Sequence, residues 1–257
     1  GCRGIVVGDM DNNGYPDILK WRFMSESQPD HDCSEYDYET VCTDDTNCYW
    51  EENNCWNGGD AEMMPHNILM NDGNNTFITH NFLPQNELIF LHSLGLMDAD
   101  LDGDLDLLAI QEEDDDQFML YLNNGMNDEG HPEFSQVYTF YRTYGGYSAS
   151  RILAIADYDN DGDQDVYVGR KYGYNWFFEN QTLTGTPGDV TYHSNPEPFF
   201  IEKALELGIA DPEVNEIGSM GYGAAWGDYD NDQDFDLYLA NWGVNRLFNN
   251  ENNIFSN

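Results

Sequence analysis

Basic residues are scarce in this sequence, which has nine Lys and Arg against 49 Asp and Glu and a formal net charge of −40 over 257 residues. A surface this acidic repels phosphate backbones and anionic lipid headgroups, so the charge disfavours nucleic-acid binding and direct contact with a membrane. The charge leaves cations, positively charged partners and calcium-bridged carbohydrates as possible partners. With 40% hydrophobic and 14% aromatic residues, the chain still has enough apolar material for a sizeable core.

Long apolar runs are also lacking, because no stretch approaches the roughly 18 consecutive apolar residues of a membrane-spanning helix. We therefore expect no direct membrane insertion. No signal-peptide pattern stands at the start, and the sequence begins at Gly1 inside a strand-like segment. We expect a mature product or a piece of a longer polypeptide.

Motifs for catalysis are absent as well. The six histidines are scattered without zinc-protease spacing, and there is no nucleophile elbow, phosphate-cradling glycine loop or dinucleotide fingerprint. Carboxylates occur in pairs, but their spacing is better explained by metal binding than by acid-base chemistry. We therefore expect no catalytic residues and a chain that is not an enzyme.

What the sequence does contain is one acidic spacing that occurs four times. In each copy, named loops 1 to 4 in chain order, residues that could offer a side-chain or backbone oxygen occupy positions 1, 3, 5, 7 and 9. They are Asp9, Asp11, Asn13, Tyr15 and Asp17 in loop 1, Asp98, Asp100, Asp102, Asp104 and Asp106 in loop 2, Asp157, Asp159, Asp161, Asp163 and Asp165 in loop 3, and Asp228, Asp230, Asp232, Asp234 and Asp236 in loop 4.

This spacing suits calcium, a hard cation that takes about six to eight oxygen ligands from side chains at positions 1, 3, 5 and 9 and from the backbone carbonyl at position 7. Glycine at position 6 of the first three loops permits the sharp turn with positive φ. Loop 4 has Gln233 at that position, which costs strain, and Asn13 removes one carboxylate from loop 1. We predict up to four Ca²⁺ ions, one per loop, with loops 1 and 4 the weaker sites.

An EF-hand shares the opening of these loops but needs a bidentate Glu at position 12 and a helix on each side. Position 12 is Lys20, Ala109, Val168 or Leu239, so none of the loops has that Glu. The runs that follow the loops, such as 165–169, are short and rich in β-branched or aromatic residues. Each loop is therefore predicted to close a β-hairpin.

The loops belong to a longer repeat. One strand enters the loop, a second leaves it, a third ends at an Asn-rich turn, and a fourth opens on an aromatic residue at Phe77, Phe134, Phe199 or Phe255. Four short strands per unit, with turns at regular spacing, are the signature of a propeller blade. We predict an all-β fold, a partial or open β-propeller whose four-stranded blades cover about residues 3–84, 88–142, 148–210 and 217–257.

The run 221–241, followed by 245–250, resembles the FG-GAP or VCBS repeat of integrin-α-like β-propellers. The resemblance covers nearly the whole chain apart from an insertion at about residues 25–65 in the first blade. It implies a calcium-stabilised propeller, secreted or at the cell surface, in which adhesion or binding of a protein or glycan ligand is more common than catalysis. Gln233 and Asn13 depart from the pattern, which affects the strength of two sites and not the fold.

Four blades are fewer than such propellers commonly use, and they would leave open sheet edges. Either further blades lie in a longer parent chain, or other copies of the chain cover the ends and form an extracellular filament. A different alternative is a calcium-dependent polysaccharide lyase, which needs a basic residue beside the metal. The candidates for that role are few: Arg142, Arg151, Arg170, Lys171 and Arg246.

Four of the five cysteines, Cys33, Cys42, Cys48 and Cys55, crowd into the insertion. Dense cysteine without histidine at zinc spacing favours disulfides and an oxidising compartment, and the three possible pairings remain open. Cys2 either pairs with a cysteine outside this sequence or stays a buried thiol. The aromatic-rich insertion is either a recognition surface or a loop stapled by its bridges.

Two sequons, at Asn74 and Asn180, fit N-glycosylation of a secreted chain, although such tripeptides also arise by chance.

Overall fold

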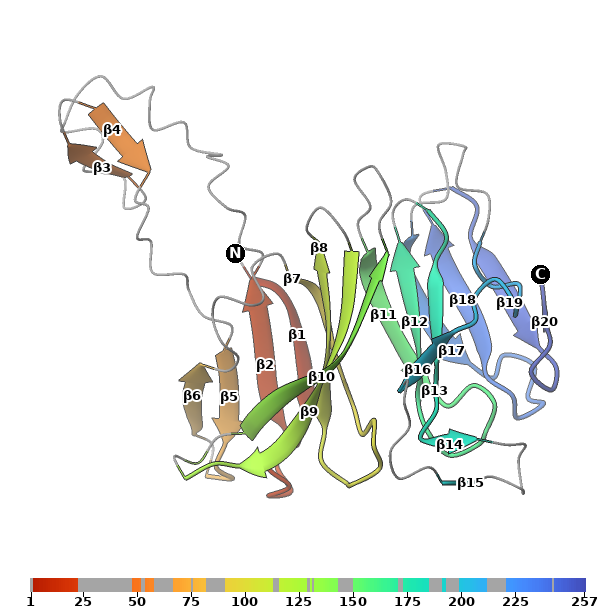
Figure 1. Ribbon diagram of the computed structural model, residues 1–257, viewed down its shortest axis with the longest axis horizontal. Coiled ribbons are helices and arrows are strands. Elements are labelled where there is room, and N and C mark those ends of the chain that lie inside the picture. Colours follow the sequence, from red (N-terminus) through yellow and green to blue (C-terminus); the bar gives the residue numbers. More distant parts are fainter. Residues whose placement is uncertain are drawn as a thin grey trace.

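The computed structural model shows an all-β protein, as the sequence predicts, built mainly from four four-stranded antiparallel sheets (Figure 1). No closed propeller is present in the part of the chain that the structure describes, and the division into blades stays a prediction. In that part no helix is long and apolar enough to cross a membrane. The described residues are 2–22, 48–51, 54–57, 67–74, 76–81, 91–112, 116–128, 130, 132–142, 150–170, 173–184, 191–192, 199–211, 221–241 and 243–257.

Each large sheet takes its four strands from one continuous part of the chain. The first sheet has the order β1-β2-β5-β6, from Cys2–Gly8, Asp17–Arg22, Asn67–Asn71 and Phe77–Asn81. The second has the order β7-β8-β9-β10, from Leu91–Met97, Asp106–Glu112, Asp116–Met126 and Pro132–Arg142.

The third and fourth sheets follow the same plan. The third has the order β11-β12-β13-β16, from Ser150–Ala156, Asp165–Arg170, Trp176–Asn180 and Phe200–Glu202. The fourth has the order β17-β18-β19-β20, from Gly221–Gly227, Asp236–Asn241, Arg246–Asn250 and Phe255–Ser256.

The first two strands of every sheet form a hairpin that one of the acidic loops closes. The last pair before the turn is Gly8 with Asp17 in the first sheet and Ala156 with Asp165 in the third. Position 9 of each loop is therefore the first residue of a strand, which fixes its side chain against the body of the sheet. The predicted hairpins are confirmed in all four sheets.

The four sheets stand in a row in which the first strands of neighbouring sheets make contact, β1 with β7, β7 with β11 and β11 with β17. The first and fourth sheets lie at opposite ends of this row (Figure 1). Because side chains alternate across a strand, the second and third sheets can bury both faces. In β12, for example, Val166 and Val168 point to the second sheet and Tyr167 points to the fourth.

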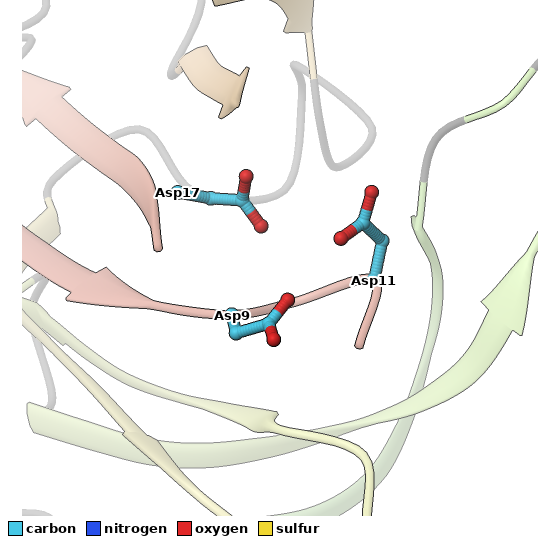
Figure 2. Close-up of side chains that lie close together, drawn as sticks. All are labelled: Asp9, Asp11 and Asp17. Atoms are coloured by element: carbon cyan, nitrogen blue, oxygen red, sulfur yellow. The ribbon is translucent and has the colours of Figure 1, made fainter. Parts of the chain in front are cut away.

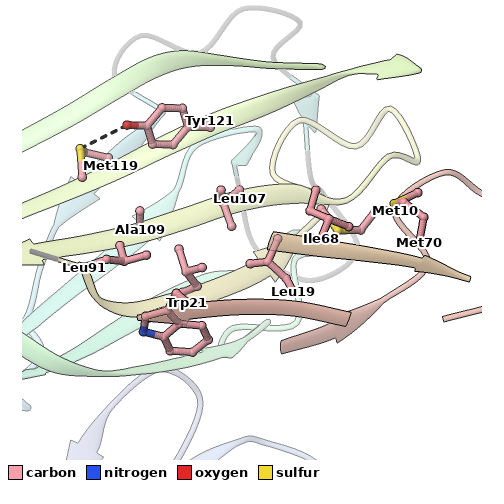
Figure 3. Packing of buried hydrophobic residues seen from close by; sticks show 11 residues of the cluster. Met10, Leu19, Trp21, Ile68, Met70, Leu91, Leu107, Ala109, Met119 and Tyr121 are labelled. Carbon is pink, nitrogen blue, oxygen red and sulfur yellow. Dashed lines mark hydrogen bonds between the residues drawn. The ribbon is translucent and has the colours of Figure 1, made fainter. Parts of the chain in front are cut away.

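Three apolar clusters fill the junctions between neighbouring sheets. The first joins the first and second sheets around Leu19, Ile68 and Leu107 (Figure 3). The second, between the second and third sheets, is largely aromatic, and the rings of Phe118 and Phe178 stack with centroids 4.2 Å apart. The third joins the third and fourth sheets. The core is thus distributed along the row instead of lying in one sheet.

Two smaller sheets lie outside this plan. The link from residue 181 to 198 contains a two-stranded sheet of β14 (Leu183–Thr184) and β15 (Thr191–Tyr192). Within the expected insertion, β3 (Cys48–Glu51) pairs antiparallel with β4 (Asn54–Asn57). Cys33 and Cys42, and the side chains of the other cysteines, lie outside the described residues, so the disulfides and the fate of Cys2 stay predictions.

Candidate metal sites

Each acidic loop brings the carboxylates of positions 1, 3 and 9 together. One oxygen from each member of a triad lies within 4.8 Å of the others, close enough for a single cation to contact all three. Figure 2 shows the loop 1 triad, whose carboxyl groups surround a common space. The four triads are Asp9, Asp11 and Asp17; Asp98, Asp100 and Asp106; Asp157, Asp159 and Asp165; and Asp228, Asp230 and Asp236.

The aspartate at position 9 is the buried anchor of each loop. In loop 2 the two oxygens of Asp106 accept hydrogen bonds from the backbone N–H of Ala99, at 2.7 Å, and of Asn123, at 2.9 Å. Asp17, Asp165 and Asp236 make the equivalent pair of bonds, and all four side chains are at most 1% exposed. This residue therefore ties the loop to the third strand of its own sheet.

Position 1 shapes the turn from its other side. Asp157 accepts the N–H of Asp161 at 3.0 Å and that of Gly162 at 3.1 Å, and Asp228 makes the same two contacts in loop 4. These bonds are local side-chain to backbone contacts of the kind that stabilise tight turns. They hold the turn in a shape that keeps the carboxylates close together.

Position 5 is not a member of the four triads. Its side-chain oxygen instead accepts the N–H of position 7, at 3.1 Å from Asp163 to Asp161 and at 2.8 Å from Tyr15 to Asn13. Of the five predicted ligand positions, the structure thus brings the side chains of three together, namely 1, 3 and 9. The roles predicted for positions 5 and 7, the latter through its backbone carbonyl, stay predictions.

Positions 4 and 6 have positive φ in every loop. Position 6 is Gly14, Gly103 or Gly162, with φ of 87°, 97° and 106°, and in loop 4 it is Gln233, with φ of 82°. A side chain in this left-handed region crowds the backbone, so the loop favours glycine there. The strain expected at Gln233 is therefore present.

Burial and mutual repulsion raise the pKa of several loop carboxyl groups. Desolvation, with smaller contributions from neighbouring aspartates, raises the pKa of Asp106 to about 7 and that of Asp159 to about 7. Burial likewise raises the pKa of Asp165 well above its usual value. A bound cation would oppose these effects, because it favours the charged form of every carboxylate around it.

The donor set fits calcium. All of the triad atoms are carboxylate oxygens, which a hard cation prefers, and no sulfur or imidazole takes part. In loop 2, Oδ1 of Asp98 is buried and has no hydrogen-bond partner among the described residues, although buried polar atoms are nearly always paired. A cation held by the triad would supply that partner.

In the second, third and fourth sheets, an asparagine of the third strand links the sheet to the loop of the sheet before it. The side-chain amide of Asn123 donates to the carbonyl of Met10 in loop 1 at 3.2 Å, and that of Asn180 donates to Ala99 in loop 2 at 3.0 Å. Asn250 makes the same bond to loop 3. The sequence shows the Asn-rich turns, but their role depends on how neighbouring sheets stack, which the pattern alone does not reveal.

This role corrects one prediction. Asn180 was expected to carry a glycan, but its side chain is 1% exposed and its amide nitrogen is bound to Ala99. A glycan on that nitrogen would have no room in the folded protein. Asn74 lies exposed in the turn between β5 and β6, and its glycosylation stays a prediction.

Comparison with known families agrees with the repeat seen in the sheets. A family model described as an FG-GAP-like repeat matches residues 98–168, a stretch that contains loops 2 and 3 and ends in β12. This part of the chain is thus similar to an FG-GAP-like repeat, in agreement with the sequence resemblance. Such repeats are typical of extracellular proteins. No curated protein matches the chain significantly.

Proposed function

We propose that this chain is an extracellular, calcium-stabilised array of FG-GAP-like repeats, arranged as blades of a propeller, and that it serves as a non-catalytic module for adhesion or ligand binding. The observation that carries the proposal is the recurrence of one carboxylate triad, with a buried anchor, at the same point of all four sheets. Four equivalent sites of one chemistry fit a structural metal better than a single active centre.

Calcium would act by joining two strands and a turn. The ion would neutralise carboxylates that come from the end of one strand, from the turn and from the start of the next, so that the hairpin loses its internal repulsion. With free calcium at about ten to a hundred times the dissociation constant, each site would stabilise the folded state by roughly 1.4 to 2.7 kcal/mol. The result would be a rigid body that presents its loops to a protein or glycan ligand.

The lyase alternative finds little support in Arg170 and Arg246, the two candidate residues whose side chains the structure describes. Arg170 is the last residue of β12, whereas Asp165 of the metal site is the first, so the two lie at opposite ends of the strand. Arg170 is also fully buried, beside the ring of Trp176. Arg246 pairs with Asp211 at 2.6 Å. Neither side chain lies beside a carboxylate triad.

The test is calcium titration of the protein by isothermal calorimetry, together with an Asp159→Asn variant. Asp159 supplies a triad oxygen in loop 3 but is not the buried anchor, so the substitution removes one ligand charge and keeps the shape of the side chain. We expect the stoichiometry to fall by one and the remaining sites to keep their affinity. A matched control is Glu206→Gln, which removes one exposed carboxylate outside the loops and should leave the stoichiometry unchanged.

Unchanged stoichiometry in Asp159→Asn would remove loop 3 from the ligand assignment, and absence of calcium binding to the unsubstituted protein would overturn the proposal.

A further inference from the structure

The fourth sheet repeats a set of residues that the third sheet buries. The third sheet turns four side chains toward the fourth, and each of them is at most 8% exposed: Ala154, Tyr158, Tyr167 and Phe177. The residues at the same repeat positions in the fourth sheet, named here the C-face, are Ala225, Tyr229, Tyr238 and Leu247. Three of the four are thus identical in type, and the fourth remains a large apolar residue.

The C-face has no covering sheet among the described residues. Tyr229 is 54% exposed, Tyr238 43% and Leu247 36%, whereas their counterparts in the third sheet are at most 3% exposed. The residue at the position of Tyr229 is buried in every other loop. A contiguous set of exposed aromatic and aliphatic side chains is typical of an interaction surface.

The first sheet presents the complementary half of the same junction. Ile5, Val7, Ile18 and Leu69 are named here the N-face, and none of them belongs to the apolar cluster between the first and second sheets. Their counterparts in the second sheet do pack into that cluster: Leu94, Leu96, Leu107 and Tyr121. Leu94 is 3% exposed, but the equivalent Ile5 is 61% exposed and Val7 is 57% exposed.

Polar groups at the two ends are arranged in the same complementary way. At the three internal junctions, an asparagine of the later sheet donates to the position 2 carbonyl of the earlier loop. Asn71 holds this asparagine position in the first sheet and donates within its own sheet, to Pro16 at 3.2 Å. Tyr229 supplies the position 2 carbonyl in loop 4. The Asn71 amide of the first sheet and the Tyr229 carbonyl of the fourth therefore form the donor and the acceptor of one further junction.

A second bond runs the opposite way, from the earlier loop to the later one, at two of the three internal junctions. The position 4 amide of Asn12 reaches the next loop, where it donates to Gly103 at 3.3 Å, and Asn160 reaches loop 4 in the same way. Asn231 is the equivalent residue of loop 4, with the same positive φ. The outer side of the fourth sheet therefore carries an amide that could donate to the loop of a further sheet.

We propose that the chain associates head to tail with a second copy of itself, the C-face of one copy docking on the N-face of the next. One chain carries both halves of a junction that it already forms three times between its own sheets. The C-face and the N-face would therefore continue the same row of sheets from one copy to the next. Such a heterologous contact closes into a ring if the rotation allows and otherwise extends as a filament. Two copies would supply eight sheets, within the range of about four to eight blades that propellers use.

This association goes beyond the proposed calcium role, because the apolar faces and the asparagine bonds need no metal atom. Its test is sedimentation velocity of the full chain in calcium over a series of protein concentrations. We expect dimers or larger assemblies whose proportion rises with concentration. Val7→Lys in the N-face and Tyr238→Lys in the C-face each place a charge in the junction and should weaken association by about tenfold or more.

Mixing the two variants gives the sharper result. Val7→Lys keeps an intact C-face and Tyr238→Lys keeps an intact N-face, so the mixture should form a one-to-one complex that neither variant forms alone. Ile5→Lys and Tyr229→Lys repeat the experiment at independent positions. Val137→Lys is the matched control, since Val137 is 42% exposed on β10 and belongs to neither face. It should assemble as the unsubstituted chain does.

A monomer at every concentration, assembly that the face variants do not weaken, or a mixture that forms no complex would each overturn head-to-tail docking. A monomer would instead point to further repeats outside this sequence, in the same polypeptide or in another protein, as the occupants of the faces. Calcium titration of Val7→Lys and Tyr238→Lys separates this result from the proposed function, because neither residue lies within an acidic loop and the stoichiometry should not change.

Discussion

Gln233 is the loop residue whose backbone conformation suits its side chain least. Its φ of 82° lies in the left-handed region, where a residue with a Cβ costs roughly 1–2 kcal/mol. Glycine at this position would remove the clash, although it also gains freedom in the unfolded chain. We expect Gln233→Gly to raise the free energy of unfolding by about 1 kcal/mol, measured by chemical denaturation in calcium.

The control for this prediction is Gln233→Ala, which shortens the side chain but keeps its Cβ. It should bring no comparable gain. Equal stability of the Gly and Ala variants would show that the positive φ is not what limits loop 4.

At the scale of single elements, Asn71 and Asn123 form a natural pair. Both belong to the third strand of their sheet, and both donate to the carbonyl at position 8 of their own loop, Pro16 or Leu105, at 3.2 Å. Asn123 also donates to Met10 of the preceding sheet. A comparison of the two therefore isolates the bond between neighbouring sheets.

We expect Asn123→Ala to destabilise the protein more than Asn71→Ala, by about 1–3 kcal/mol, because it leaves the Met10 carbonyl without its partner at a buried junction. Chemical denaturation of both variants under one set of conditions gives the difference. Equal losses would mean that the asparagine acts only within its own sheet.

Most strands could be predicted from the sequence because the alternation of apolar residues and the loop spacing are local signals. Asn67–Asn71, Trp176–Asn180 and Arg246–Asn250 end at the Asn-rich turns that the sequence predicts, whereas β9 runs past Asn123 to Met126. The fourth strand of the third sheet begins at Phe200, one residue after the expected Phe199, and the pairing of β14 with β15 had no clear alternating pattern to reveal it.

The triads could also be predicted in outline, since a hairpin turn with aspartates at alternate positions must bring several carboxylates close together. Local spacing could not show that position 9 would be fully buried and bonded to the third strand, as Asp106 is to Asn123. Nor could it show that Asn180 would be buried against Ala99, because that contact joins residues of two different sheets. Contacts between distant parts of the chain were therefore the part that sequence reasoning missed.

For the whole molecule, the raised pKa values determine how stability depends on pH without calcium. The pKa of Asp106 and that of Asp159 are about 7 in the folded protein, against 3.8 for an ordinary aspartate, so the folded state binds these protons more tightly than the unfolded chain. Their contribution to stability is fully present below pH 3.8 and is lost as the pH rises through about 7. The net charge of −40 adds repulsion in the same direction.

We therefore expect the melting temperature of the calcium-free protein, measured in a chelator, to fall between pH 5 and pH 8. Calcium should reverse much of this fall, because the ion favours the ionised carboxylates. The increase in melting temperature caused by calcium should therefore grow with pH. Asp159→Asn should show a shallower fall in the chelator, since one of the titrating groups is gone. If the melting temperature of the calcium-free protein stays level or rises over this range, the loop carboxyl groups are not protonated as described. If the effect of calcium on the melting temperature does not change with pH, protons and the ion do not compete.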